Sequence, residues 1–341
     1  MDSLLSKFDI LGVKISAINM SDALRIIEEA LHEKTRAYIS TCPVSTILAC
    51  QRDAEVRDSI NSAILAAPDG MPIVWLGRMA GHSNIRRVYG PDLLLEICKI
   101  SEEKGYKNYF YGSTPETINK LNRKLAEKFP RLIIAGTFSP PFRELTKEED
   151  KAIINKINSS APDIIWVGLG SPKQDIWMHQ HRNIIDAPIM IAVGAAFDFV
   201  SGSKPQAPRW IQRCGLEWSF RLFNEPKRLW KRYLIGNSLF ILLLSLNQIR
   251  KLKEDLMKDK IIFPAATITV FILMVFIMLS LGSLSSDIKD LGQKVYLLTN
   301  KINSKDMLMF EQKITELKKN IYELESKYKG SKQEKFDKDN K

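Results

Sequence analysis

Short apolar segments recur along the first 200 residues and predict the strands of a sheet. Most of them are apolar at nearly every position, which is typical of strands that are covered on both faces. We expect strands at residues 37–42, 62–68, 108–113, 131–138, 163–170 and 188–197.

Helical patterns lie between these segments. Residues 115–129 and 146–159 show helical spacing of apolar positions, and Thr146 and Glu149 have the spacing of a capping box. The alternation predicts an α/β fold with a mostly parallel, doubly wound sheet and flanking helices. In such sheets ligands bind beyond the carboxyl ends of the strands.

The pattern changes near residue 205. Residues 205–259 are basic and rich in tryptophan and predict short helices, with an apolar run at 235–246 that is too short by itself to cross a bilayer. Residues 201–260 hold 13 Lys and Arg against five Asp and Glu, so most of the net charge of +11 is concentrated there. Such a cluster indicates a surface for phosphates, anionic lipid or nucleic acid.

The next segment, residues 261–286, contains no charged side chain. Its length exceeds what a helix needs to cross the roughly 30 Å hydrocarbon core, so we expect a transmembrane helix at 260–286, with a buried core helix as the alternative. Five Lys and Arg lie in 250–260 and two in 287–300. The positive-inside rule therefore places the N-terminal part in the cytoplasm, on the inner face of a membrane crossed once.

Beyond this segment, apolar residues at intervals of three and four predict a coiled coil over 287–329 with one discontinuity. The seam residues are Ile288, Leu291, Val295, Leu298 and Ile302, then Phe310, Ile314, Leu317, Ile321, Leu324 and Tyr328. Residues 330–341 are predicted to be disordered. The expected organisation is an α/β domain over 1–204, a basic appendage over 205–259, the transmembrane helix, the coiled coil and the tail.

Several chemistries lack their motifs. The four cysteines form no CxxC pair, which favours a reducing compartment, and the N-terminus does not resemble a signal peptide. His179 and His181 lie two apart on a predicted helix and so point in different directions, which is poor spacing for a metal. The sequence has no GxxxxGK[ST] phosphate loop or GxSxG elbow, and its one DxD, at Asp337 and Asp339, lies in the tail.

Four strand ends carry candidate chemistry. At 168–174, glycines and the start of a helix could bind a phosphate through backbone N–H groups. Asp69, which precedes Gly70, could accept a proton or could cap the helix predicted at 71–78. Thr41 ends the strand at 37–42, and Asp198 is a carboxylate in an otherwise apolar segment.

Six segments occur in an order that resembles the WecG/TagA/CpsF glycosyltransferases, glycosyltransferase family 26. They are residues 41–49, 67–75, 87–94, 168–178, 194–202 and 215–234, and the resemblance covers about 8–250. It implies a Rossmann-like fold and inverting transfer of a sugar from a UDP-sugar to an undecaprenyl-pyrophosphate-linked sugar, without a metal or other cofactor. The sugar would be N-acetylmannosamine, its uronic acid or glucose, in teichoic acid, capsule or other surface polysaccharide synthesis.

The resemblance also implies roles for individual residues. Asp69 matches the proposed general base, and Thr41 lines the active site. The residues matched to the UDP-sugar are Gly170, Lys173, Gln174, Asp198, Arg87 and Asp92. Those matched to the lipid pyrophosphate are Arg221, Arg228, Lys231 and Arg232. Members of the family often have asparagine where this chain has Pro43.

Two other functions remain open at this point. A catalytically degenerate homologue could act as a membrane scaffold for polysaccharide assembly, and the Pro43 departure favours it whereas the intact Asp69 does not. A nucleic-acid-binding protein is suggested by the charge, but that charge lies beside the predicted span, so we expect no nucleic acid partner. The expected partners are the donor, the lipid-linked acceptor, the membrane and a second copy of the chain, paired through the coiled coil.

Overall fold

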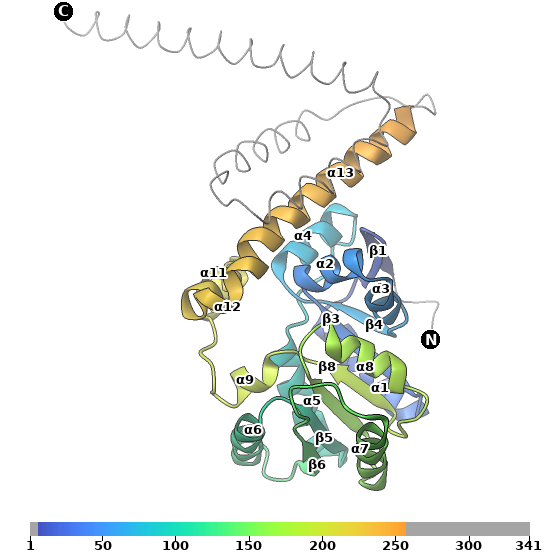
Figure 1. Cartoon of the computed structure of the whole chain (residues 1–341), viewed down its shortest axis with the longest axis vertical. Coiled ribbons are helices and arrows are strands. Elements are labelled where there is room, and N and C mark those ends of the chain that lie inside the picture. Colours follow the sequence, from blue (N-terminus) through green and yellow to red (C-terminus); the bar gives the residue numbers. More distant parts are fainter. Residues whose placement is uncertain (1–5, 257–341) are drawn as a thin grey trace, which may run out of the picture. The chain divides into compact units, whose positions relative to one another are not determined.

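The described chain, residues 6–256 of a computed structural model, is built around a six-stranded parallel sheet (Figure 1). The strand order is β4-β3-β8-β7-β5-β6, and every neighbouring pair is parallel. The strands are β3 (Ala37–Cys42), β4 (Leu65–Pro68), β5 (Lys107–Gly112), β6 (Ile133–Phe138), β7 (Ile164–Gly168) and β8 (Ile189–Ala192). All six predicted strands are therefore confirmed, as is the α/β class. The predicted transmembrane helix, coiled coil and tail lie outside the described residues.

Helices cover both faces of the sheet, as the apolar strands require. In β7, Ile164 and Trp166 belong to one core cluster, whereas Ile165 and Val167 belong to another. The first face is covered by α1 (Met20–Glu33), α5 (Gly90–Lys104), α6 (Pro115–Lys128) and α9 (Ala196–Val200). The second is covered by α2 (Val44–Arg52), α3 (Ala54–Asn61), α4 (Met71–Met79), α7 (Lys147–Ser159) and α8 (Lys173–His181).

The capping box predicted for α7 is present. The Thr146 hydroxyl accepts a hydrogen bond from the Glu149 backbone N–H at 3.2 Å, and the Glu149 carboxylate accepts one from the Thr146 N–H at 2.9 Å. Both hydrogen bonds satisfy donors that the helix itself leaves unpaired.

An antiparallel hairpin near the N-terminus was not predicted. It pairs β1 (Lys7–Ile10) with β2 (Val13–Ser16) through a turn in which Leu11 and Gly12 both have positive φ. The Gly12 N–H donates to the Asp9 carboxylate at 3.0 Å. Its signal in the sequence was a two-residue turn ending in glycine between short alternating segments.

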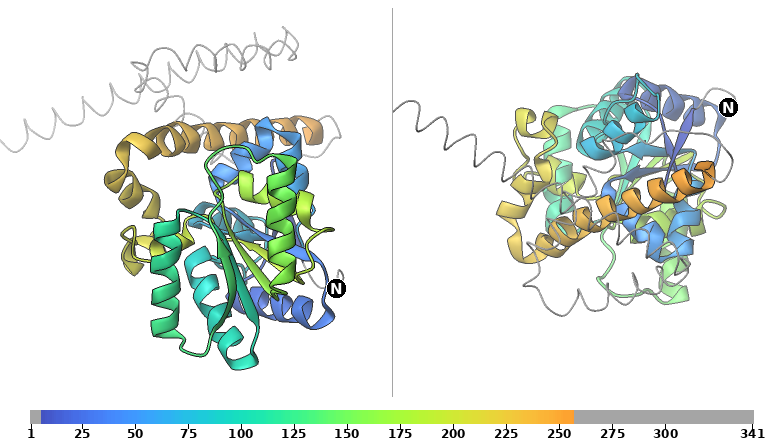
Figure 2. Two further views of the ribbon diagram at one scale, coloured as in Figure 1. Left: turned by 60° about the horizontal axis from the view of Figure 1, so that its bottom comes forward. Right: turned by 90° about the horizontal axis from the view of Figure 1, so that it is seen from above.

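The residues after 205 are helical. The elements are α10 (Arg209–Arg213), α11 (Glu217–Asn224), α12 (Pro226–Trp230), the π-helical turn η1 (Lys231–Ile235) and α13 (Gly236–Leu256). Pro226–Lys251 is one continuous helix, long and apolar enough to cross a membrane by length and composition alone, so the apolar run at 235–246 is not the short isolated segment that we predicted. Within this helix, however, Phe240 is buried in the same core cluster as Ile47 of α2. Figure 2 shows α13 lying along the α/β fold, where it contacts α2.

Candidate active site

Thr41 and Asp69 lie at the carboxyl ends of two adjacent strands. The register of β3 and β4 pairs Thr41 with Ala67 and Cys42 with Pro68, and the Asp69 N–H donates to the Cys42 carbonyl at 3.3 Å. Thr41 is 4% exposed. The structure therefore brings these two predicted residues together at the edge of the sheet where ligands of doubly wound folds bind.

The Asp69 side chain faces an arginine rather than the start of α4. Gly70 is the N-cap of α4, and no side chain caps that helix. The Arg87 Nε and Nη2 atoms each lie 3.0 Å from Asp69 Oδ1. The helix-capping interpretation of Asp69 is thus wrong, and its carboxylate is available at the edge of the sheet.

Arg87 is held on its other side by Glu217 of α11. The Arg87 Nη1 atom lies 2.7 Å from Glu217 Oε2, and the guanidinium stacks 3.9 Å above the Tyr89 ring. The Tyr89 hydroxyl donates to Glu217 Oε1 at 3.3 Å. Burial lowers the pKa of Arg87, but the carboxylates of Asp69 and Glu217 outweigh this and raise it overall.

Sequence reasoning assigned no role to Tyr89 or Glu217. Both lie inside segments that carry the family resemblance, at 87–94 and 215–234. The available signal was Glu217 itself, a glutamate among aromatic residues in a predicted helix. A carboxylate buried in such a place needs a cationic partner, and that need pointed to an ion pair.

The corner after β7 contains the predicted phosphate-binding residues. Gly170 has a φ of +82°, and the Gln174 N–H donates to its carbonyl at 3.0 Å. The Ser171–Pro172 peptide bond is cis, and Pro172 is the N-cap of α8. The Gln174 amide oxygen accepts from the Gly194 N–H at 3.1 Å, which ties the corner to the loop after β8, and Lys173 is exposed.

Asp198 of α9 connects to the appendage through a lysine. The Lys204 Nζ lies 3.2 Å from Asp198 Oδ2 and 3.1 Å from Glu225 Oε1. Arg228 also pairs with Glu225. A single cation therefore bridges one carboxylate of the α/β part and one of the appendage, as Arg87 also does.

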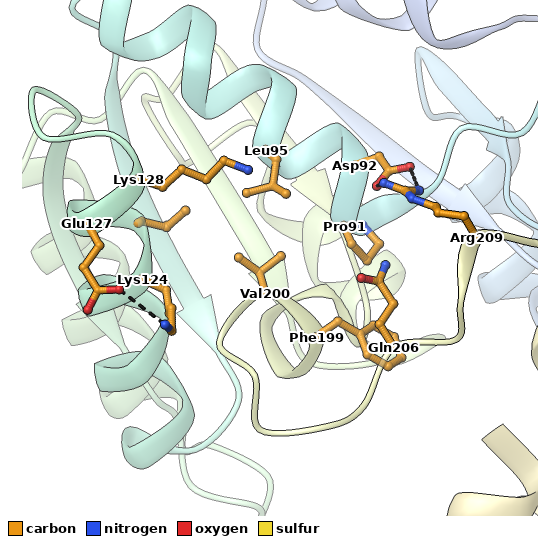
Figure 3. Close-up of a pocket in the computed structure, with 11 residues that line it drawn as sticks. Pro91, Asp92, Leu95, Lys124, Glu127, Lys128, Phe199, Val200, Gln206 and Arg209 are labelled. Carbon is orange, nitrogen blue, oxygen red and sulfur yellow. Dashed lines mark hydrogen bonds and ion pairs between the residues drawn. The ribbon is translucent and has the colours of Figure 1, made fainter. Parts of the chain in front are cut away.

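Asp92 belongs to a different environment. Its carboxylate accepts hydrogen bonds from Arg209 at 2.6 and 2.9 Å at one end of a cavity of about 380 Å³ between α5, α6 and α9 (Figure 3). Leu95 and Val200 supply apolar lining, and Lys124 pairs with Glu127 at the opposite side. The cavity lining includes none of Asp69, Thr41 and Gln174.

The appendage cations differ in their surroundings. Arg232 donates to the Ser45 hydroxyl at 2.6 Å at the start of α2, and it lies within electrostatic range of Arg221, Arg228 and Asp69. The Arg221 guanidinium lies 5.2 Å from the centre of the Phe199 ring, and its buried Nε makes no hydrogen bond within the described residues. Lys231 lies 5.5 Å from the Trp230 ring. Arg232 thus lies near Asp69 and near two further arginines, and an anion would relieve the repulsion among the three cations.

No group of three or more His, Cys, Asp and Glu is placed to hold a metal ion among residues 6–256. The charged groups that the structure does gather at the sheet edge are carboxylates and arginines.

Comparisons with known proteins agree with this geometry. The family model described as "Glycosyl transferase WecG/TagA/CpsF family" matches residues 8–254. The N-acetylglucosaminyldiphosphoundecaprenol N-acetyl-beta-D-mannosaminyltransferase of Bacillus subtilis (strain 168) is 30% identical over 205 residues, which cover 60% of this chain and 77% of that protein. The protein of the same name from Bacillus spizizenii is 27% identical over 204 residues, with the same coverage of each chain. The family match covers most of the chain, including every candidate site residue, and so the chain belongs to the WecG/TagA/CpsF glycosyltransferase family.

Proposed function

We propose that this chain is an inverting glycosyltransferase that moves a sugar from a UDP-sugar to a polyprenyl-pyrophosphate-linked sugar. Asp69 carries the proposal, because it places a carboxylate at the carboxyl edge of the sheet, in contact with Arg87 and within electrostatic range of Arg232. The names of the two Bacillus relatives favour N-acetylmannosamine as the transferred sugar and an undecaprenyl-diphosphate-linked N-acetylglucosamine as the acceptor. The product would serve teichoic acid or other surface polysaccharide synthesis.

The proposed reaction is a direct displacement. Asp69 accepts the proton of the acceptor hydroxyl as that oxygen forms a bond to the anomeric carbon of the donor. The bond from the anomeric carbon to the diphosphate oxygen breaks, and its electron pair leaves with UDP. Attack opposite the leaving group inverts the anomeric configuration.

Two anionic groups must be held for this displacement. We assign the donor diphosphate to the corner at Gly170 and Gln174, where backbone N–H groups and the start of α8 favour negative charge. We assign the acceptor pyrophosphate to Arg221, Arg228, Lys231 and Arg232. The unpaired Nε of Arg221 and the gathering of like charges support an anion there.

The appendage is also proposed to contact the cytoplasmic face of the membrane. Trp210 is 65% exposed and Phe223 is 85% exposed, and Arg213 of α10 and Lys227 of α12 are exposed as well. Aromatic and basic side chains together are typical of a surface that enters lipid headgroups. Phe240 packs into the core, so we propose that α13 lies along the membrane and that residues 260–286 cross it.

The test replaces Asp69 with Asn, which keeps the shape and removes the proton acceptor. We expect turnover to fall roughly 10²–10⁴-fold, measured as UDP release from UDP-N-acetylmannosamine with a short-chain polyprenyl-pyrophosphate-linked N-acetylglucosamine. Donor affinity, measured by calorimetry, should hardly change.

Near-parental turnover in the Asp69→Asn protein would remove Asp69 from the mechanism. Failure of the parent protein to release UDP with any UDP-sugar would instead favour the scaffold alternative.

A further inference from the structure

Two carboxylates from distant parts of the chain share the guanidinium of Arg87. Asp69 follows β4, and Glu217 begins α11 of the appendage. Different nitrogens of Arg87 make the two contacts. Nε and Nη2 each lie 3.0 Å from Asp69 Oδ1, and Nη1 lies 2.7 Å from Glu217 Oε2. Both contacts with Asp69 use Oδ1, so neither uses Oδ2 as an acceptor.

The surroundings fix Arg87 in this position. Its side chain is 15% exposed, and the side chain of Glu217 is 11% exposed. The Tyr89 ring lies beneath the guanidinium, and the Tyr89 hydroxyl reaches the second oxygen of Glu217. The guanidinium therefore has contacts on two sides and on one face, and it cannot rotate to form a two-oxygen pair with Asp69 without losing Glu217.

This arrangement matters for a general base. An arginine beside a single carboxylate lowers the pKa of that carboxyl by about one to three units, which makes it a poorer proton acceptor. A second carboxylate on the same arginine repels the first and offsets part of that effect. Glu217 thereby counteracts the influence of Arg87 on Asp69.

We propose that Glu217 is a positioning residue of the active site. Through Arg87 it orients the Asp69 carboxylate and keeps it basic enough to accept the proton of the acceptor hydroxyl. The inference rests on the proposed function of Asp69 as the base. It assigns a part of the proton-transfer machinery to the appendage, in addition to anion binding.

Other groups also act on Asp69, namely the buried Cys42 thiol, the Tyr89 hydroxyl and Arg232. Of these, the Tyr89 hydroxyl donates to Glu217, and the amide oxygen of a glutamine can accept the same hydrogen bond. None of them bridges Asp69 to a second carboxylate in the described part of the chain. Because glutamine keeps this acceptor and removes only the charge, a response to Glu217→Gln can be attributed to the Arg87 bridge.

The experiment compares the pH dependence of kcat/KM in the full-length parent and the Glu217→Gln protein, in detergent with the short-chain acceptor. Gln keeps the shape and a hydrogen-bond acceptor for Arg87 but removes the charge. The low-pH limb of the kcat/KM profile should move to lower pH, because Asp69 loses the repulsion of a second carboxylate, and turnover at neutral pH should fall roughly three- to tenfold.

Two further variants complete this comparison. Asp186→Asn removes an exposed carboxylate that pairs with Arg36 at 2.8 Å, and its low-pH limb should match the parent. Glu217→Asp moves the carboxylate away from Arg87 by one methylene group. Its low-pH limb should move in the same direction as that of Glu217→Gln, but by a smaller amount. This variant replaces Glu217→Gln in the comparison with the parent if the Gln protein does not fold. An unchanged limb in the Glu217 variants would overturn the inference.

A second measurement separates this inference from the proposed function. The ¹³C shift of the Asp69 carboxyl carbon is followed against pH in both proteins, with Asp69→Asn used for assignment. A curve displaced to lower pH in Glu217→Gln is expected even if Asp69→Asn proves active. These two results together would reject Asp69 as the base but keep its electrostatic coupling to Glu217, whereas identical curves in the two proteins would reject that coupling.

Discussion

At the scale of single residues, Asp175 is a carboxylate with no place in the proposed reaction. It lies in α8 directly after Gln174 and is fully buried. Burial raises its pKa to about 6, although the hydroxyls of Ser40 and Ser171 act in the opposite direction. The folded protein therefore binds this proton more tightly than the unfolded chain, whose Asp pKa is about 3.9.

This difference predicts a pH-dependent stability. The stabilising effect of the proton is complete below about pH 4 and is lost as the pH rises through about 6. The advantage of Asp175→Asn over the parent should therefore grow by about 1–2 kcal/mol in unfolding free energy between pH 5 and pH 8. Urea unfolding followed by tryptophan fluorescence measures it. The exposed Asp186→Asn serves as control, and a difference that stays constant with pH would contradict the assignment.

At the scale of elements, the sequence predicted the parts whose signal is local. The strand at 37–42 has the predicted bounds, because a continuous apolar run between polar residues defines both its ends. The β1–β2 hairpin escaped because four-residue strands give little periodicity. The helix from Pro226 to Lys251 was predicted as separate pieces, because a π-helical turn and Gly236 interrupt its pattern.

The candidate site likewise contains residues that local sequence predicts and contacts that depend on how distant helices pack. Asp69 and Thr41 could be predicted because each follows or ends a strand, and the ends of parallel strands meet at one edge, whereas Gln174 was indicated by the family resemblance. The contact of Arg87 with Glu217 could not, because it depends on how α11 packs on the sheet. Asp92 was matched to the UDP-sugar because the motif at 87–94 contains it. In the structure, however, its side chain pairs with Arg209.

Close approach of two strands gives a prediction at this scale. Gly112 ends β5 with a φ of +123°, and a Cβ there would lie 2.5 Å from the backbone of Gly168 in β7. Gly112→Ala should lower the free energy of unfolding by roughly 2–4 kcal/mol. Gly105 is the matched control, because its φ is +74° and a Cβ would meet nothing within 4 Å.

For Gly105→Ala only the strained backbone remains, so the loss should be about 1 kcal/mol. Thermal unfolding of both variants measures the difference. Equal losses would mean that the contact between β5 and β7 relaxes without cost.

At the scale of the whole molecule, the described residues lie in one compact unit. This unit contains both Asp69 and Glu217, so it holds every group that we assign to the reaction. The apolar seams predicted over 287–329 need a partner helix to bury them. We propose that a second copy of the chain supplies that partner.

A chain that ends at Asp259 tests this division. It should release UDP with the short-chain acceptor at a rate within a few-fold of the full chain, because the site is complete. It should also lose stable oligomers, measured by light scattering in detergent. An unchanged oligomeric state would assign assembly to the compact unit itself, and a loss of turnover would show that residues beyond 259 support the site.

The Arg87 bridge also has a consequence for how the protein is made. Glu217 follows Arg87 by 130 residues, so at the usual pace of synthesis it is added on the order of ten seconds later. During that interval the nascent chain has Asp69 and Arg87 but not the carboxylate that joins them. Addition of Glu217 sets the earliest time at which the bridge can close. The order of residues along the chain thus makes the Arg87 bridge a contact that forms late in synthesis.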